Sequence, residues 1–64
     1  MTRLTWNIIR EQARKQGWRL AVFRHPRRGE YYANAHGKHG SMWARTPDEM
    51  AYLIEADRQF WEHM

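Results

Sequence analysis

Aromatic rings, arginines and small apolar residues alternate along residues 18–45 of this 64-residue chain. Successive residues of a β-strand point to opposite sides of a sheet, so this alternation sorts the segment into two faces. One face would carry apolar side chains: Trp18, Leu20, Val22, Ala33, Ala35, Met42 and Ala44. The other would carry rings, cations and an amide: Arg19, Phe23, His25, Tyr32, Asn34, His36, Trp43 and Arg45. Flat rings can stack on bases and guanidinium groups can bind phosphates, so the second face predicts a binding surface for nucleic acid or a protein partner.

Two predicted turns add cations beside this face. Pro26–Gly29 and Gly37–Gly40 have the proline and glycine content of tight turns, and Arg27, Arg28 and Lys38 lie within them. The complete candidate surface therefore consists of Arg19, Phe23, Arg27, Arg28, Tyr32, Asn34, Lys38, Trp43 and Arg45. Two modes of binding are open at this point. Bases could stack on the rings, or the sheet could enter a DNA major groove and present arginine and asparagine to base edges.

Three strands and two flanking helices are predicted to position this surface. Helical periodicity spans Leu4–Gln16, and strand alternation spans three short segments, residues 18–25, 30–36 and 41–45. A threonine, a proline and two acids follow at residues 46–49, which is the capping box of a second helix with proline at its first position. The order predicts one α+β domain over residues 1–64, a two-layer arrangement of a helix, a three-stranded antiparallel meander and a helix.

The alanines of the apolar face suggest where the helices pack. With Pro26–Gly29 as the turn, the predicted register places Leu20 opposite Ala35, Val22 opposite Ala33 and Phe23 opposite Tyr32. Small side chains in the middle of a sheet allow a helix to approach closely, so both helices are expected on the alanine-lined face. The alternative is that the first helix covers the rings and makes them a second core. The interleaved Arg19, Asn34 and Arg45 argue against this, because unpaired polar groups are costly to bury.

Composition limits the class of protein. The chain has no cysteine, which excludes disulfides and thiolate metal sites. It has no apolar run near the roughly 20 residues of a membrane span, and its first residues lack the apolar core of a signal peptide. We therefore expect a cytoplasmic protein that does not enter a membrane.

Charge is distributed unevenly along the chain. The formal net charge is +4. Residues 1–45 hold ten Lys and Arg against two acids, a net of +8, whereas residues 46–64 hold one Arg against five acids, a net of −4. The alternative is that charge serves only solubility, but its segregation exceeds what solubility needs. A positive side of this kind attracts nucleic acid or an acidic protein.

Residues for catalysis or metal binding are few. Ser41 is the single serine and lacks an evident acid–base relay, and the chain has no glycine-rich phosphate loop. His25, His36 and His39 lie in or beside the predicted turns, but a zinc site normally shows four clear ligands. We therefore expect no enzymatic activity, no metal and no cofactor.

The second helix carries a separate candidate interface. Its apolar side includes Leu53, Phe60 and Trp61, and Asp57 interrupts it. Asp57 could form a partly buried ion pair with Arg10 or Arg24, or it could contact a partner. The two rings could seal the end of the core or form an apolar patch for a homodimer or another protein. Asp57, Phe60 and Trp61 are therefore candidate protein-interface residues.

Two known layouts resemble parts of this chain. The run from Trp18 through Gly29, with the third strand leading into Thr46–Glu49, resembles the three-stranded-sheet-plus-helix DNA-binding domains of phage and transposon integrases. This likeness covers about 45 residues and rests on a strand tryptophan, turn glycines and a capped helix. The order of elements is also similar to double-stranded-RNA-binding domains. That family has a lysine-rich start to its last helix, where this chain has Pro47, Asp48 and Glu49, so binding in that mode is not expected.

Two functions follow from the sequence. The first is a small basic module that binds nucleic acid, DNA in particular, through the ring-bearing sheet face, of the kind that phages and mobile elements encode. The second is a protein–protein inhibitor of a host defence complex, of the anti-CRISPR type, that blocks a site on a larger nucleoprotein machine. The rings and arginines favour the first function, and the acidic second helix with its apolar end favours the second.

Overall fold

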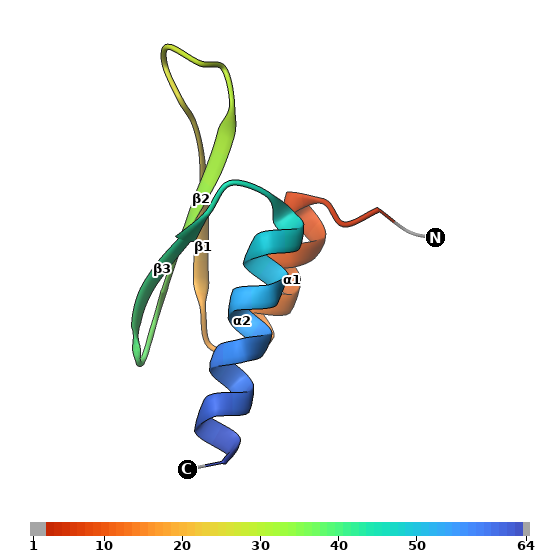
Figure 1. Cartoon of the computed structure of the whole chain (residues 1–64), viewed down its shortest axis with the longest axis vertical. Coiled ribbons are helices and arrows are strands. Elements are labelled where there is room, and N and C mark those ends of the chain that lie inside the picture. Colours follow the sequence, from red (N-terminus) through yellow and green to blue (C-terminus); the bar gives the residue numbers. More distant parts are fainter. Residues whose placement is uncertain (1–2, 64) are drawn as a thin grey trace.

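The computed structural model describes residues 3–63 and contains two helices and a three-stranded antiparallel sheet (Figure 1). The order along the chain is α1 (Trp6–Lys15), β1 (Arg19–Arg24), β2 (Tyr31–Gly37), β3 (Gly40–Ala44) and α2 (Pro47–Glu62). The α+β fold and the helix–meander–helix order predicted from the sequence are therefore confirmed.

Both helices begin at capping threonines. Thr5 Oγ1 accepts a hydrogen bond from the Ile8 amide at 3.3 Å, and Thr46 Oγ1 accepts one from the Glu49 amide at 3.1 Å. Each bond satisfies one of the amides that the first helical turn leaves without a partner. The predicted start of α2 at Pro47 is confirmed, whereas α1 begins at Trp6, two residues later than the periodicity suggested.

A Schellman motif ends α1 and directs the chain into the core. The Trp18 amide donates to the Ala13 carbonyl at 2.8 Å, and the Gly17 amide donates to the Arg14 carbonyl at 3.1 Å. Gly17 has a φ of +85°, a left-handed conformation that glycine adopts without a steric penalty. The motif places Trp18 immediately after the helix, where it is buried.

The register of the sheet agrees with the pattern of alternation. On the β1–β2 ladder, the pairs include the three predicted ones: Leu20 with Ala35, Val22 with Ala33 and Phe23 with Tyr32. On the β2–β3 ladder, they include Ala33 with Ala44, Asn34 with Trp43 and Ala35 with Met42. β2 is the central strand, so its alanines lie in the middle of one face.

Both helices lie on that alanine-lined face (Figure 1). The buried core consists of Ile9, Ala13, Trp18, Ala33, Ala35, Ala44, Met50 and Ile54. Leu20, Val22 and Met42 belong to the same face but are only half-buried. The expected arrangement, with the helices on the alanines and the rings on the far side of the sheet, is observed.

The β1–β2 hairpin extends beyond the helices (Figure 1). At its distal end Phe23 pairs with Tyr32, and the next pair, Arg24 with Tyr31, points to the opposite side. The Arg24 guanidinium carbon lies 5.9 Å from the centre of the Tyr31 ring, in cation–π geometry. Phe23, Arg24 and Tyr31 are all exposed, so both sides of the hairpin end can be reached by a partner.

Candidate functional site

The sheet surface that faces away from the helices is called the open face below. It comprises alternate residues of the three strands and the first residue after β3: Arg19, Ala21, Phe23, Tyr32, Asn34, His36, Ser41, Trp43 and Arg45. Phe23 is 44% exposed and Trp43 is 57% exposed. The rings therefore do not form a second core, and the sequence-based alternative that α1 covers them is wrong. The binding role of the face stays a prediction.

Three rings run diagonally across the open face. Phe23 and Tyr32 are stacked, with ring centres 5.5 Å apart and planes inclined by 27°. Trp43 is paired with Asn34, which places it diagonally from Tyr32, within reach of large side chains. The Arg45 guanidinium carbon lies 5.8 Å from the centre of the Trp43 ring. Rings and a guanidinium group therefore lie next to one another, as the alternation predicted.

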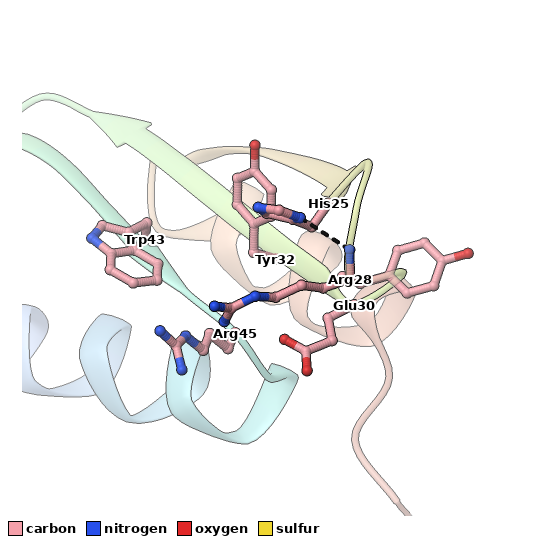
Figure 2. A pocket seen from close by; sticks show the side chains of 7 residues that line it. His25, Arg28, Glu30, Tyr32, Trp43 and Arg45 are labelled. Atoms are coloured by element: carbon pink, nitrogen blue, oxygen red, sulfur yellow. Dashed lines mark hydrogen bonds between the residues drawn. The ribbon is translucent and has the colours of Figure 1, made fainter.

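A shallow hollow of about 400 Å³ lies on this surface between Tyr32 and Trp43. Its lining includes His25, Arg28, Glu30, Tyr32, Trp43 and Arg45. Figure 2 shows the Arg28 side chain running from the turn along the sheet toward Arg45. Within residues 3–63, neither arginine forms a salt bridge. The hollow thus combines two exposed or half-exposed rings with two guanidinium groups that have no carboxylate partner in the described part of the chain.

His25 fixes the turn that presents Arg28. Its Nδ1 accepts hydrogen bonds from the backbone amides of Arg27 and Arg28, each at 3.2 Å (the Arg28 bond is drawn in Figure 2). The His25 amide donates to the Glu30 carbonyl at 2.7 Å, and the Gly29 amide donates to the His25 carbonyl at 3.0 Å. An imidazole nitrogen can accept these bonds only when it carries no proton itself. The sequence placed His25 among the rings but did not reveal this capping role.

The remaining predicted surface residues are spread over the sheet. Asn34 is half-buried in the middle of the open face, between Ala21 and Trp43 on the neighbouring strands. Arg27 is exposed in the β1–β2 turn but does not line the hollow, and Arg19 lies at the other end of β1. Lys38 belongs to the β2–β3 turn, which lies at the opposite end of β2 from Arg27 and Arg28. Lys38 lines a second hollow together with Trp18, Asp57 and Trp61, beside the end of α2. The predicted set is therefore not one compact cluster, and Lys38 lies apart from the rings and arginines of the open face.

Glu30 lines the hollow although the sequence did not single it out. It precedes β2 directly and is exposed. No local pattern marks such a residue, because its position beside Arg28 and Arg45 depends on the conformation of the turn. Its carboxylate is a negative charge at the edge of an otherwise cationic hollow.

The end of α2 forms a second cluster. The Trp61 indole donates to Asp57 Oδ1 at 3.2 Å, and the Trp61 ring stacks on His39 with centres 3.9 Å apart. Among the residues that the structure describes, neither ion pair considered for Asp57, with Arg10 or with Arg24, is formed. Phe60 lies edge-on to Trp61 and is 57% exposed. The two rings therefore do not seal the core. Trp61 instead contacts the β2–β3 turn, which the sequence did not indicate.

The exposed side of α2 is internally paired. Arg58 forms ion pairs with Glu55 and, at 2.5 Å, with Glu62. The hydrogen bond from Arg58 lowers the pKa of Glu55, and the same partners raise the pKa of Arg58 further above its usual value. Asp48 and Glu49 lie in the first turn, where acids suit the helix dipole. The acidity of α2 is therefore partly neutralised along its length.

Two further features concern residues 3–63 as a whole. No three histidine, cysteine, aspartate or glutamate side chains in this part of the chain come together as a group that could bind a metal ion. Neither α1 nor α2 combines the length and the apolar character needed to span a membrane.

Comparison of the chain with protein-family models, with curated proteins and with solved structures gives no match. The geometry and chemistry of the open face are therefore the basis on which a function can be inferred.

Proposed function

We propose that this protein is a small non-enzymatic module that binds nucleic acid, DNA in particular, through its open face. The observation that carries the proposal is the convergence of Arg28 and Arg45, neither of which is paired with an acid within residues 3–63, beside the Tyr32 and Trp43 rings. A cytoplasmic location and an origin in a phage or mobile element belong to the same proposal.

The chemistry of the face suits a polymer of bases and phosphates. A guanidinium group matches the geometry of a phosphate and can bind it with two hydrogen bonds. Stacking of a base on an aromatic side chain contributes about 1–3 kcal/mol per base. A surface for a neutral or apolar partner would need neither the unpaired arginines nor their position beside exposed rings.

The distribution of charge would orient the molecule on its ligand. Arginines lie at both ends of the open face and in the β1–β2 turn, whereas five of the seven acids of the chain lie in α2. A polyanion is attracted to the first region and repelled by the second, and salt screens both effects. The sheet would therefore approach nucleic acid ahead of α2.

Fluorescence anisotropy with labelled oligonucleotides at 50 and 200 mM salt tests the proposal. If two or three phosphates are contacted, the affinity should fall roughly ten- to fortyfold over this range, because binding releases counterions. Arg45→Ala should weaken binding more than Arg14→Ala, which removes an equal charge from α1 on a residue paired with Glu11. Absence of binding at 50 mM salt would refute the proposal.

Binding of a protein is the second candidate function. Tyr52 is 73% exposed and Phe60 is 57% exposed, and both lie on α2. Aromatic residues of this kind are enriched at protein interfaces. The protein partner would be either a second copy of the chain or a nucleoprotein complex that the protein inhibits. Analytical ultracentrifugation of the wild type and of Phe60→Ser tests self-association, and a monomer at every concentration would exclude the homodimer.

A further inference from the structure

We propose that the hollow between Tyr32 and Trp43 is a subsite for one nucleotide of a single-stranded nucleic acid. The unpaired base would lie against the two rings, and its phosphate would bind Arg28 and Arg45. This inference rests on the proposed function and selects one of the two binding modes that the sequence left open.

The position of the rings favours an unpaired base. Tyr32 and Trp43 lie on adjacent strands and are offset by two residues, because Trp43 pairs with Asn34. The space between them is a hollow and not a flat surface. In a duplex both sides of each base are covered by stacked neighbours, and only base edges are presented in the grooves. Bases of a single strand can leave the stack and offer their flat side to an aromatic ring.

The arginines favour an anion in the same hollow. Arg28 comes from the β1–β2 turn and Arg45 from the segment between β3 and α2, so the fold brings them together from separate parts of the chain (Figure 2). Two like charges near each other repel, and a bound phosphate would offset this repulsion while accepting hydrogen bonds from both groups. The hydrogen bond from the Arg28 amide to His25 holds the backbone of one of them in place.

Glu30 limits what the hollow can bind. It is the one acid among the described residues that line it. Its carboxylate would repel a second phosphate. The charges that line the hollow therefore suit the single phosphate of one nucleotide better than a group that carries several phosphates. Glu30→Gln removes this opposition without a large change in shape and should tighten the binding of a single strand about two- to fivefold at low salt.

Anisotropy titrations with a single-stranded dT15 oligonucleotide and a 15-base-pair duplex at 50 mM salt test the subsite. The wild type should bind the single strand at least tenfold more tightly. Trp43→Ala should weaken single-strand binding roughly 5- to 150-fold, the equivalent of one stacked base, and should change duplex binding less than twofold. Trp43→Phe should recover most of the loss. Arg28→Ala should weaken single-strand binding more than the control Arg14→Ala.

The outcomes separate this inference from the proposed function. Equal affinity for the two oligonucleotides, or an equal loss for both in Trp43→Ala, would overturn the subsite and leave general nucleic-acid binding in place. If the protein binds neither the single strand nor the duplex, both proposals are refuted. Circular dichroism spectra and thermal melts of each variant show whether a loss reflects the surface or the fold. If Trp43→Ala is unfolded, the Arg28→Ala and Glu30→Gln variants supply the decision, because both positions are exposed.

Discussion

Gly37 lies against the indole ring of Trp18, so closely that a Cβ atom on Gly37 would be 2.6 Å from Cε3 of the tryptophan. Trp18 is 6% exposed and belongs to the core. The last residue of β2 must therefore lack a side chain for the ring to occupy its place. The contact joins the end of β2 to the segment that follows α1, which are far apart in the sequence.

Substitution of Gly37 by alanine should destabilise the fold. The ring that the new methyl group meets is buried and cannot swing into solvent, so we expect a loss of about 1–3 kcal/mol, typical of an overpacked core. A loss of 1 kcal/mol lowers the melting temperature by roughly 4–8 °C in a domain of this size. Thermal denaturation followed by circular dichroism measures the effect.

The double variant Gly37→Ala/Trp18→Leu is the control for that experiment. If the clash with the ring is the cause, the two substitutions should be non-additive, since the smaller leucine makes room for the methyl group. Additive losses would place the cause in the backbone of β2 instead.

Truncation of Trp43 and truncation of Ile9 should differ in how much they lower the free energy of unfolding. Trp43 is more than half exposed on the open face, whereas Ile9 is fully buried beneath the sheet. We expect Trp43→Ala to change the free energy of unfolding by less than about 1 kcal/mol and Ile9→Ala to lower it by about 2–5 kcal/mol. Urea denaturation compares the two variants. A loss in Trp43→Ala as large as that in Ile9→Ala would mean that the rings are part of a core.

Loss of the His25 side chain should loosen the turn that carries Arg28. Its Nδ1 is the acceptor for the amides of Arg27 and Arg28. We expect these two amides to exchange hydrogen with solvent faster in His25→Ala, while the amides of β2 are unaffected. His25→Asn should restore part of the protection, because an asparagine oxygen can accept the same bonds. Unchanged exchange in His25→Ala would show that the turn does not depend on the imidazole.

Most of the fold follows from local patterns in the sequence. The threonine caps, Pro47 and the strand alternation depend on neighbouring residues, so the order of elements and the β1–β2 register could be derived from them. Exposure of the rings also followed, because Asn34 and two arginines share their face.

The contacts within the candidate site required the three-dimensional structure. The position of Glu30 beside Arg28 and Arg45 depends on how the β1–β2 turn is closed, and that closure uses the His25 side chain. The stack of His39 on Trp61 joins a turn to the end of a helix. Neither contact can be predicted from the spacing of residues in the sequence, because each depends on how separate elements pack together. The ion pair considered for Asp57 was wrong for the same reason, because Asp57 accepts a hydrogen bond from the Trp61 indole one helical turn away.

Acid should weaken α2 through Glu55. The hydrogen bond from Arg58 lowers the pKa of Glu55 below its ordinary value of 4.5. The stability that a depressed carboxyl pKa contributes is present above the unfolded pKa and is lost as the pH falls through the folded one. The stability difference between wild type and Glu55→Gln should therefore be constant near neutral pH and should shrink below pH 4.5. Because the pair is exposed, we expect a small effect.

Arg58→Leu is the matched variant for this pH dependence. It removes the donor that lowers the pKa of Glu55, so Glu55→Gln made in the Arg58→Leu background should show little of the acid-dependent difference. Urea denaturation at pH 3, 4 and 7 gives the free energies of unfolding of the wild type, the two single variants and the double variant at each pH. A difference between wild type and Glu55→Gln that persists at pH 3 would place its origin outside the carboxylate.

Trp61 should determine how firmly the last turns of α2 are held. Its ring is stacked on His39 in the β2–β3 turn, and its indole N–H is bound to Asp57. The neighbouring Phe60 is exposed. An aromatic pair contributes about 0.5–1.5 kcal/mol, so amides of residues 58–62 should exchange roughly two- to twelvefold faster in Trp61→Ala. Phe60→Ala removes the ring that lies edge-on to Trp61 but keeps the stack on His39, so it should accelerate the exchange of these amides less than Trp61→Ala does. Equal acceleration in both variants would mean that the stack on His39 does not hold the helix end, and that the two rings act only through the helical propensity of their positions.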